Sequence, residues 1–176
     1  DPATMWASSM VSRAIAADAR YAPAYIGRAN LERVQGSYDA ALADLTEAVR
    51  LTPESAEALH ARGLVHQRMV RHREAIIDFD AAIDRNPFVS APYAARGQSL
   101  IATNQFDKAI EDYNAALNVN NKDATSWAYR GLAYEKSNRR KEATESYQRA
   151  AQIDPGNPSA KQGLGRTSGG MGSLFN

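Results

Sequence analysis

The sequence predicts an all-α protein, a right-handed solenoid of stacked helix–turn–helix repeats. Three observations lead to this fold class. A period of 34 residues runs through most of the 176-residue chain, apolar and polar residues alternate at helical spacing within each period, and a proline recurs near the end of three periods. A unit of this length cannot bury its apolar face alone, so neighbouring units must stack to form a continuous core.

The period rests on positions at which the residue type is repeated. An arginine recurs every 34 residues and is followed each time by a small residue. An alanine stands thirteen residues after each arginine, and a large apolar residue follows four positions later. These repeated residues are Arg28, Arg62, Arg96 and Arg130, then Ala41, Ala75, Ala109 and Ala143, then Leu45, Phe79, Tyr113 and Tyr147.

The elements follow in order from this register. Segment 1–21 is predicted to hold one amphipathic helix, Met5 to about Asp18, which is the second helix of a partial repeat. Four full repeats then cover 22–55, 56–89, 90–123 and 124–157, each with two helices of about 14 residues. The turns within them are placed at 35–37, 70–72, 103–105 and 137–139. Residues 158–166 are predicted to form a helix that covers the last repeat, and 167–176 a flexible Gly/Ser-rich tail.

Helix ends carry their own signals. Pro53, Pro87 and Pro155 are expected to end second helices, because proline lacks an N–H and disfavours helical geometry in the residue before it. Asp123 and Asn157 are candidate caps, because their side chains can accept hydrogen bonds from the first backbone N–H groups of the following helix.

This pattern resembles the tetratricopeptide repeat (TPR) family over roughly residues 5–166. The commonest family pattern has Leu before the first-helix Gly, where this chain has Arg four times. In that respect it is similar to short bacterial Arg–Gly-type TPR proteins, including envelope lipoproteins of the NlpI type, which act as adaptors. The similarity implies a bacterial periplasmic or envelope location and an anchoring Cys upstream of Asp1. The cytoplasm is the alternative.

The repeated arginines allow two interpretations. An Asp stands sixteen residues after three of them, so we expect partly buried pairs that tie the two helices of a repeat together. The alternative is a ladder of arginines that binds an anionic ligand. In the fourth repeat Ser146 replaces the Asp, so Glu142 or Glu145 is the expected partner of Arg130. The expected structural pairs are Arg28–Asp44, Arg62–Asp78 and Arg96–Asp112.

The resemblance also implies a function and a site. In TPR proteins the first helices line a concave groove, and their side chains there contact a partner. The implied function is that of a non-catalytic adaptor that holds a protein or peptide. The co-chaperone carboxylate clamp is not expected, since only Asn30 matches its residues. The predicted groove residues are Ile26, Asn30, Arg33, His60, Leu64, Gln67, Arg68, Gln98, Ile101, Leu132, Glu135 and Lys136.

Other function classes find little support in the sequence. The 21 basic and 20 acidic residues leave no basic excess of the kind that nucleic-acid binders show. No apolar run approaches the ~20 residues of a membrane span. There is no cysteine, and His60, His66 and His72 are spaced unlike a metal pair. Phosphate-loop and nucleophile motifs are missing, so we expect neither an enzyme, nor a cofactor, nor a metal.

Three alternatives stay open. The basic turns RMVRHR (68–73) and NRRK (138–141) could bind an anionic ligand, although such runs are usually solvated. The N-terminal helix around Trp6 and Met10 could support self-association, which would make the protein a homo-oligomer. Leu174 and Phe175 of the tail could dock into the groove and block it until a partner displaces them.

Overall fold

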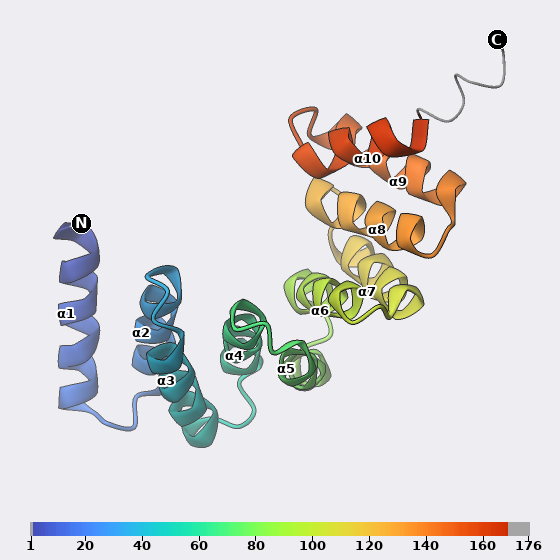
Figure 1. The fold of residues 1–176 in the computed structure, drawn as a ribbon. Helices are drawn as coiled ribbons and strands as arrows, with labels where there is room; N and C mark the ends of the chain where they lie inside the picture. Colours follow the sequence, from blue (N-terminus) through green and yellow to red (C-terminus); the bar gives the residue numbers. More distant parts are fainter. Residues whose placement is uncertain (1, 169–176) are drawn as a thin grey trace, which may run out of the picture. The chain divides into compact units, whose positions relative to one another are not determined.

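The computed structural model describes the backbone of residues 2–168 and the side chains from Met5 to Ser168. All the regular structure in this part of the chain is α-helical (Figure 1). The expected tail site at Leu174 and Phe175 lies outside the described residues. The helices are α1 (Pro2–Ala17), α2 (Ala22–Val34), α3 (Tyr38–Leu51), α4 (Ala56–Arg68), α5 (His72–Arg85), α6 (Ser90–Ala102), α7 (Phe106–Val119), α8 (Ala124–Lys136), α9 (Arg140–Ile153) and α10 (Pro158–Ser168).

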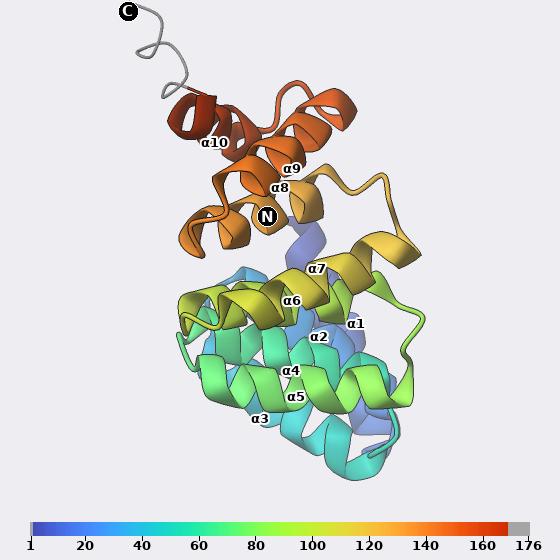
Figure 2. The ribbon, with the colours of Figure 1, turned by 90° about the vertical axis from the view of Figure 1, so that its right-hand side faces the viewer.

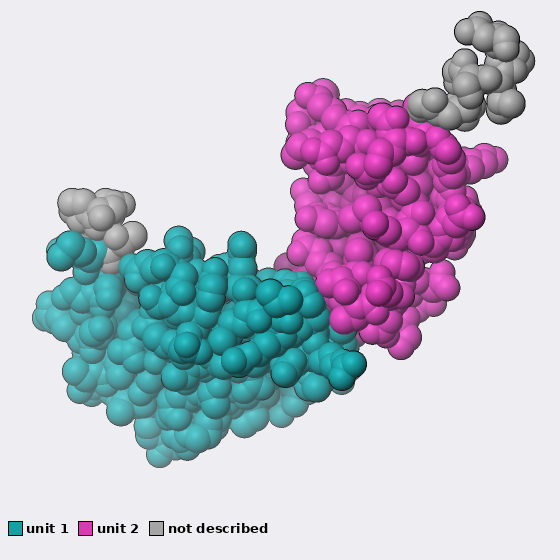
Figure 3. Space-filling model, in the orientation of Figure 1, with its two compact units in different colours: residues 1–87 teal, residues 88–176 magenta. Residues whose placement is uncertain are grey.

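The chain divides into two compact units, residues 1–87 and 88–176 (Figure 3). In unit 1, α2 pairs with α3 and α4 with α5, while α1 packs on α2 and α3 on α4. Figure 2 shows α4 and α5 lying side by side along their lengths. In unit 2, α6 pairs with α7 and α8 with α9, α7 packs on α8, and α10 lies against both α9 and α8.

The helix bounds follow the 34-residue register with small differences. The second turn lies at residues 69–71, one position before the expected 70–72, and α5 begins at His72. The last helix continues to Ser168, two residues beyond its expected end at Arg166. α1 begins at Pro2 and ends at Ala17.

Side chains of the preceding residues cap the N-termini of α8 and α10. Asp123 accepts a hydrogen bond from the N–H of Thr125 at 3.0 Å, and Asn157 accepts one from the N–H of Ala160 at 2.9 Å. Each bond satisfies a backbone donor that has no partner inside its helix. The three prolines follow the last residues of α3, α5 and α9 by two positions, where their missing N–H interrupts no helical bond.

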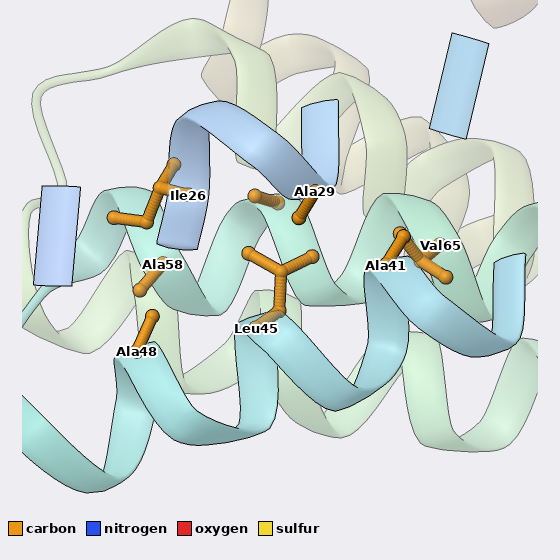
Figure 4. Packing of buried hydrophobic residues seen from close by; sticks show 8 residues of the cluster. Ile26, Ala29, Ala41, Leu45, Ala48, Ala58 and Val65 are labelled. Carbon is orange, nitrogen blue, oxygen red and sulfur yellow. The ribbon is translucent and has the colours of Figure 1, made fainter. Parts of the chain in front are cut away.

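The cores are built around small residues at repeated positions. In unit 1, Ala41 and Ala48 of α3 are fully buried on either side of Leu45. Figure 4 shows Leu45 pointing between the two neighbouring helices, with Ala29 of α2 beside it. Because alanine adds little volume, the helix backbones approach closely and the few large side chains fill the spaces left between them.

Glycine on the first helices receives the aromatic ring of the second helices. A Cβ on Gly97 would lie 2.8 Å from Cε2 and Cζ of Tyr113, closer than real Cβ contacts. Gly63 stands in the same relation to Phe79, and Gly131 to Tyr147. Each of these glycines directly follows a repeated arginine. The position must stay without a side chain because the aromatic ring of the same repeat occupies the space.

The turns inside the repeats share one backbone conformation. The residue two positions before each second helix has a positive φ: 80° at Gly36, 60° at Val70, 60° at Asn104 and 62° at Asn138. Glycine and asparagine adopt this left-handed conformation readily, whereas a β-branched residue does so only with strain. Val70 is thus a strained residue in a turn whose equivalents are unstrained.

Candidate functional site

The first three repeats each contain an Arg–Asp pair that joins the two helices of the repeat. Arg28 on α2 donates from Nε and Nη2 to the two carboxylate oxygens of Asp44 on α3, at 2.6 and 2.7 Å. Such a bidentate contact occupies both carboxylate oxygens and fixes the relative position of the helices. The same two bonds run from Arg62 to Asp78 and from Arg96 to Asp112.

Arg130 has other partners than the glutamates expected from the sequence. Its Nη1 donates to Asn114 Oδ1 on α7 at 2.8 Å, and its Nε donates to Ser146 Oγ on α9 at 3.3 Å. The guanidinium also lies over the ring of Trp127, 4.2 Å from the centroid. Burial lowers the pKa of Arg130 from its ordinary value. Neither Glu142 nor Glu145, the expected partners, hydrogen-bonds this arginine, because Asn114, Ser146 and the Trp127 ring occupy the guanidinium. Glu145 acts only through its charge, which opposes the lowering of the pKa.

One predicted groove residue of unit 1 lies in the core instead. Ile26 is only 6% exposed and belongs to the buried cluster that includes Ala29, Leu45 and Ala58 (Figure 4). It is covered because α4 packs against α2 and α3. Ile26 therefore presents no apolar surface to a partner.

The other predicted residues of unit 1 remain at or near the surface. The ring of His60 packs against Phe79 with centroids 5.8 Å apart. Burial, and then the charge of Arg33, lower the pKa of His60, so its imidazole is neutral near pH 7. Half-buried or exposed positions on α2 and α4 hold Asn30, Arg33, Leu64, Gln67 and Arg68.

In unit 2, three of the predicted residues line one pocket. Leu132, Glu135 and Lys136 of α8 form one wall, and the volume is about 430 Å³, within the range of small-ligand sites. Gln98 and Ile101, on α6, do not line it. The other lining residues are Ala128, Tyr129, Tyr147, Ser159, Gln162 and Arg166.

A polar network closes one side of the pocket. Arg166 of α10 donates from Nε and Nη2 to the two oxygens of Glu135, at 2.7 and 2.9 Å. Tyr147 of α9 donates its hydroxyl proton to Glu135 Oε2 at 2.7 Å. The bonds from Arg166 hold the pKa of Glu135 below its ordinary value, whereas burial and the bond to Glu135 raise the pKa of Tyr147. The carboxylate is therefore ionised and has both oxygens engaged.

A glycine allows α10 to lie close to this network. A Cβ on Gly163 would overlap Cζ of Tyr147. The register places Tyr129 of α8 and Ala95 of α6 at the equivalent position. Because Gly163 has no side chain, α10 packs directly on the Tyr147 ring, and the pocket lies between α8 and α10.

The pocket residues on α10 could have been found from the sequence. Ser159, Gln162 and Arg166 stand 34 residues after Thr125, Ala128 and Leu132. The latter three occupy groove positions of the fourth repeat, so the same positions of the covering helix also face the pocket. The helix predicted at 158–166 therefore contributes side chains to the pocket as well as covering the last repeat. No comparable sequence signal marks Tyr147, whose hydroxyl reaches the pocket from α9.

The basic turn NRRK (138–141) is largely engaged within the protein. Arg139 lies over the Tyr134 ring, 4.6 Å from its centroid, and bonds Glu142. Arg140 donates to the backbone oxygens of Arg166 and Thr167, both at 2.9 Å. The contacts of Arg140 support α10, and the Glu142 carboxylate compensates the charge of Arg139.

Neither a possible membrane span nor a metal-ligating cluster occurs among residues 2–168. No helix in that range is both long enough and apolar enough to cross a bilayer. The same residues contain no cluster of three or more His, Asp or Glu side chains placed to hold a metal ion.

Two family models match parts of the chain. One, described as a TPR repeat, covers residues 29–70, and the other, described as a tetratricopeptide repeat, covers residues 94–158. Together they span helices of both units. No curated protein sequence matches the chain.

Several solved structures share the fold. MamA from Desulfovibrio magneticus RS-1 is 23% identical with a TM-score of 0.79, over 86% of this chain and 85% of that one. YrrB, a TPR protein with an unusual peptide-binding site, is 21% identical with a TM-score of 0.77, over 92% and 83%. The first TPR of Spaghetti (RPAP3), bound to the HSP90 peptide SRMEEVD, is 24% identical with a TM-score of 0.65, over 67% and 94%. At these identities the likeness shows the fold, an all-α solenoid of helix pairs.

Proposed function

Because the chain is a tetratricopeptide repeat protein, we propose that it is a non-catalytic adaptor that holds a segment of a partner protein against its first helices. Repeats of this kind generally serve as protein–protein interaction modules. The pocket between α8 and α10 is the proposed contact site in unit 2. Asn30, Arg33, His60, Leu64, Gln67 and Arg68 are proposed as contacts in unit 1, and Gln98 and Ile101 as further contacts in unit 2.

One observation carries this proposal. A pocket of about 430 Å³ lies where groove positions of α8 meet the equivalent positions of α10. Its lining combines the half-buried apolar side chain of Leu132 with polar and charged groups. Such a combination suits a peptide, which offers both side chains to bury and a backbone to hydrogen-bond.

Affinity capture from lysate of the source organism tests the proposal. Leu132→Asp places a charge on the apolar wall and should release every protein that binds through the pocket. The matched control is Gln148→Asp, on an exposed position of α9 that does not line the pocket. Both variants should first show the helical content of the native chain by circular dichroism.

Proteins retained by the native chain and by Gln148→Asp, but lost with Leu132→Asp, would support the proposed site. Equal recovery with all three chains would show that partners bind elsewhere. The compartment of the recovered proteins also tests the proposed relation to bacterial envelope lipoproteins of the NlpI type, which rests on the four Arg–small-residue pairs. Cytoplasmic partners alone would contradict an envelope location.

Self-association is a second candidate function, favoured by apolar side chains on α1. Met5, Trp6 and Met10 are 74%, 70% and 53% exposed. If they pair two copies, the mass of the native chain in light scattering should rise with concentration. A Trp6→Ser, Met10→Ser variant should then stay monomeric. A native chain of constant monomer mass would exclude this function.

A further inference from the structure

The pocket between α8 and α10 also indicates which partners it accepts. We propose that it selects a peptide segment in which an Asp or Glu side chain stands next to a bulky apolar residue. This inference rests on the proposed function of the pocket as a partner-binding site. It adds the chemistry of the partner, which the fold by itself does not specify.

The pocket carries a small excess of positive charge. Two cations, Lys136 and Arg166, and one carboxylate, Glu135, line it, so the formal balance is +1. Both oxygens of Glu135 already accept hydrogen bonds, from Arg166 and from Tyr147. Glu135 is therefore poorly placed to bind a cationic group of a partner, since that group would have to compete with a bidentate guanidinium.

Every remaining polar group can donate a hydrogen bond, although Ser159 and Gln162 can also accept one. Lys136 is exposed at the rim with an ammonium group that has three donors and no acceptor. Gln162 and Ser159 are exposed on α10 and can each donate as well. A ligand carboxylate matches this set, because it offers only acceptors and meets an uncompensated positive charge.

The rest of the lining is apolar. Leu132 and Tyr129, both half-buried, form a wall on α8. An apolar side chain placed against this wall loses its contact with water, which supplies most of the binding free energy in such sites. The carboxylate of the peptide then fixes its orientation in the pocket. The acidic residue and the apolar residue together therefore define the segment that is bound.

An acidic side chain within a chain fits better than a free carboxyl terminus. Binding a chain end usually requires several donors that converge on one carboxylate. Arg166 is the strongest candidate for that role, but two of its donor groups are held by Glu135. Lys136 alone remains as a full positive charge, and a single ammonium at the rim suits one Asp or Glu side chain.

Selection from a library of random peptides, displayed between two flanking proteins so that no peptide has a free carboxyl terminus, tests the inference. The native chain should enrich Asp or Glu beside Leu, Ile or Phe. Lys136→Glu should weaken an enriched peptide about fivefold to tenfold and shift the selection toward Lys and Arg. Lys141→Glu, which makes the same charge change on α9 outside the pocket, should leave affinity and selection unchanged.

A second variant increases the positive charge that is available to a peptide in the pocket. Glu135→Gln frees the guanidinium of Arg166 and should tighten the binding of acidic peptides about fivefold. Enrichment of peptides with no acidic preference, or an equal effect of Lys136→Glu and Lys141→Glu, would overturn the inference and leave the partner-binding function standing. If the native chain enriches no peptide beyond a Leu132→Asp chain, both the function of the pocket and this inference fail.

Discussion

Arg62 on α4 and Asp78 on α5 are joined by two parallel hydrogen bonds, 2.9 Å from Nε to Oδ2 and 2.7 Å from Nη2 to Oδ1. The carboxylate is almost fully buried, and the arginine side chain is 23% exposed. His66 lies next to the pair, with Nε2 3.7 Å from Asp78 Oδ2. The pair therefore links two helices through a charge that has little access to water.

Removing one member of this pair should be costly. Arg62→Ala leaves Asp78 buried without its partner, and the free energy of unfolding should fall by about 3 kcal/mol. Arg62→Met with Asp78→Leu removes both charges and should be nearly neutral. Urea unfolding followed by circular dichroism measures both. The control is Arg50→Ala, which breaks the exposed pair with Glu47 and should change stability much less. A double variant as unstable as Arg62→Ala would contradict this account.

Two glycines should respond in opposite ways to the same substitution. Gly97→Ala drives a methyl group into the ring of Tyr113, which is fully buried and cannot move freely, so stability should fall by about 1–3 kcal/mol. A Cβ on Gly165, in α10, would have no neighbouring atom within 4 Å, so Gly165→Ala should raise stability by about 0.5–1 kcal/mol through helix propensity. Thermal unfolding of the two variants measures both effects. Equal shifts of the melting temperature would refute the steric argument.

The strained turn between α4 and α5 offers a stabilising substitution. Val70 has a φ of 60°, and Asn104 and Asn138 occupy the equivalent turns. Val70→Asn should therefore raise the free energy of unfolding by about 1 kcal/mol. The reverse change, Asn104→Val, should lower it by a similar amount. If Val70→Asn is neutral or harmful while its helical content is native, the strain at this turn is compensated by contacts of the valine.

Acidification should weaken unit 1 through His66. Burial is the main cause that lowers the pKa of His66, and the positive charges of Arg62 and Arg71 lower it further. The negative charges of Asp78 and Glu74 act in the opposite direction but do not outweigh burial. The unfolded chain therefore binds the proton at higher pH than the folded one. Stability is full above the unfolded pKa, near 6.5, and falls as the pH drops toward the folded pKa.

The variant His66→Leu isolates this effect, because Leu100 holds the equivalent position in the third repeat. Its melting temperature should decline less between pH 7 and pH 5 than that of the native chain. Part of the decline should remain, because burial also lowers the pKa of His60. Parallel curves for the two chains would show that His66 does not titrate differently on folding.

The end of α10 should depend on Arg140. Its two hydrogen bonds satisfy backbone oxygens of Arg166 and Thr167 in the last turn of that helix. Arg140→Ala should speed amide hydrogen exchange in α10 about fivefold, the equivalent of about 1 kcal/mol. The control is Arg149→Ala, which removes an exposed arginine whose side chain hydrogen-bonds Gln152 on the same helix, α9. Unchanged exchange in α10 would mean that its packing on Tyr147 suffices.

Much of the fold was accessible from the sequence. The period places both helices of every repeat, and proline, Asp123 and Asn157 mark their ends, because helix formation and capping depend on residues close in sequence. The offset of sixteen residues also brings Arg62 opposite Asp78, since both lie within a single helix pair whose geometry repeats. Local rules were sufficient for the helix ends and for the three Arg–Asp pairs, but not for Tyr147, which bonds Glu135 inside the fourth repeat.

Contacts between successive repeats could not be predicted from the repeat pattern. Ile26 occupies a groove position but is buried, because α4 covers it. Arg130 bonds Asn114 of the preceding repeat rather than a glutamate of its own. The pocket arises where Arg166 reaches back to Glu135 across 31 residues. The order of residues alone predicts the repeats and the Arg–Asp pairs inside them, whereas exposure and side-chain partners between repeats depend on how closely the next helix approaches.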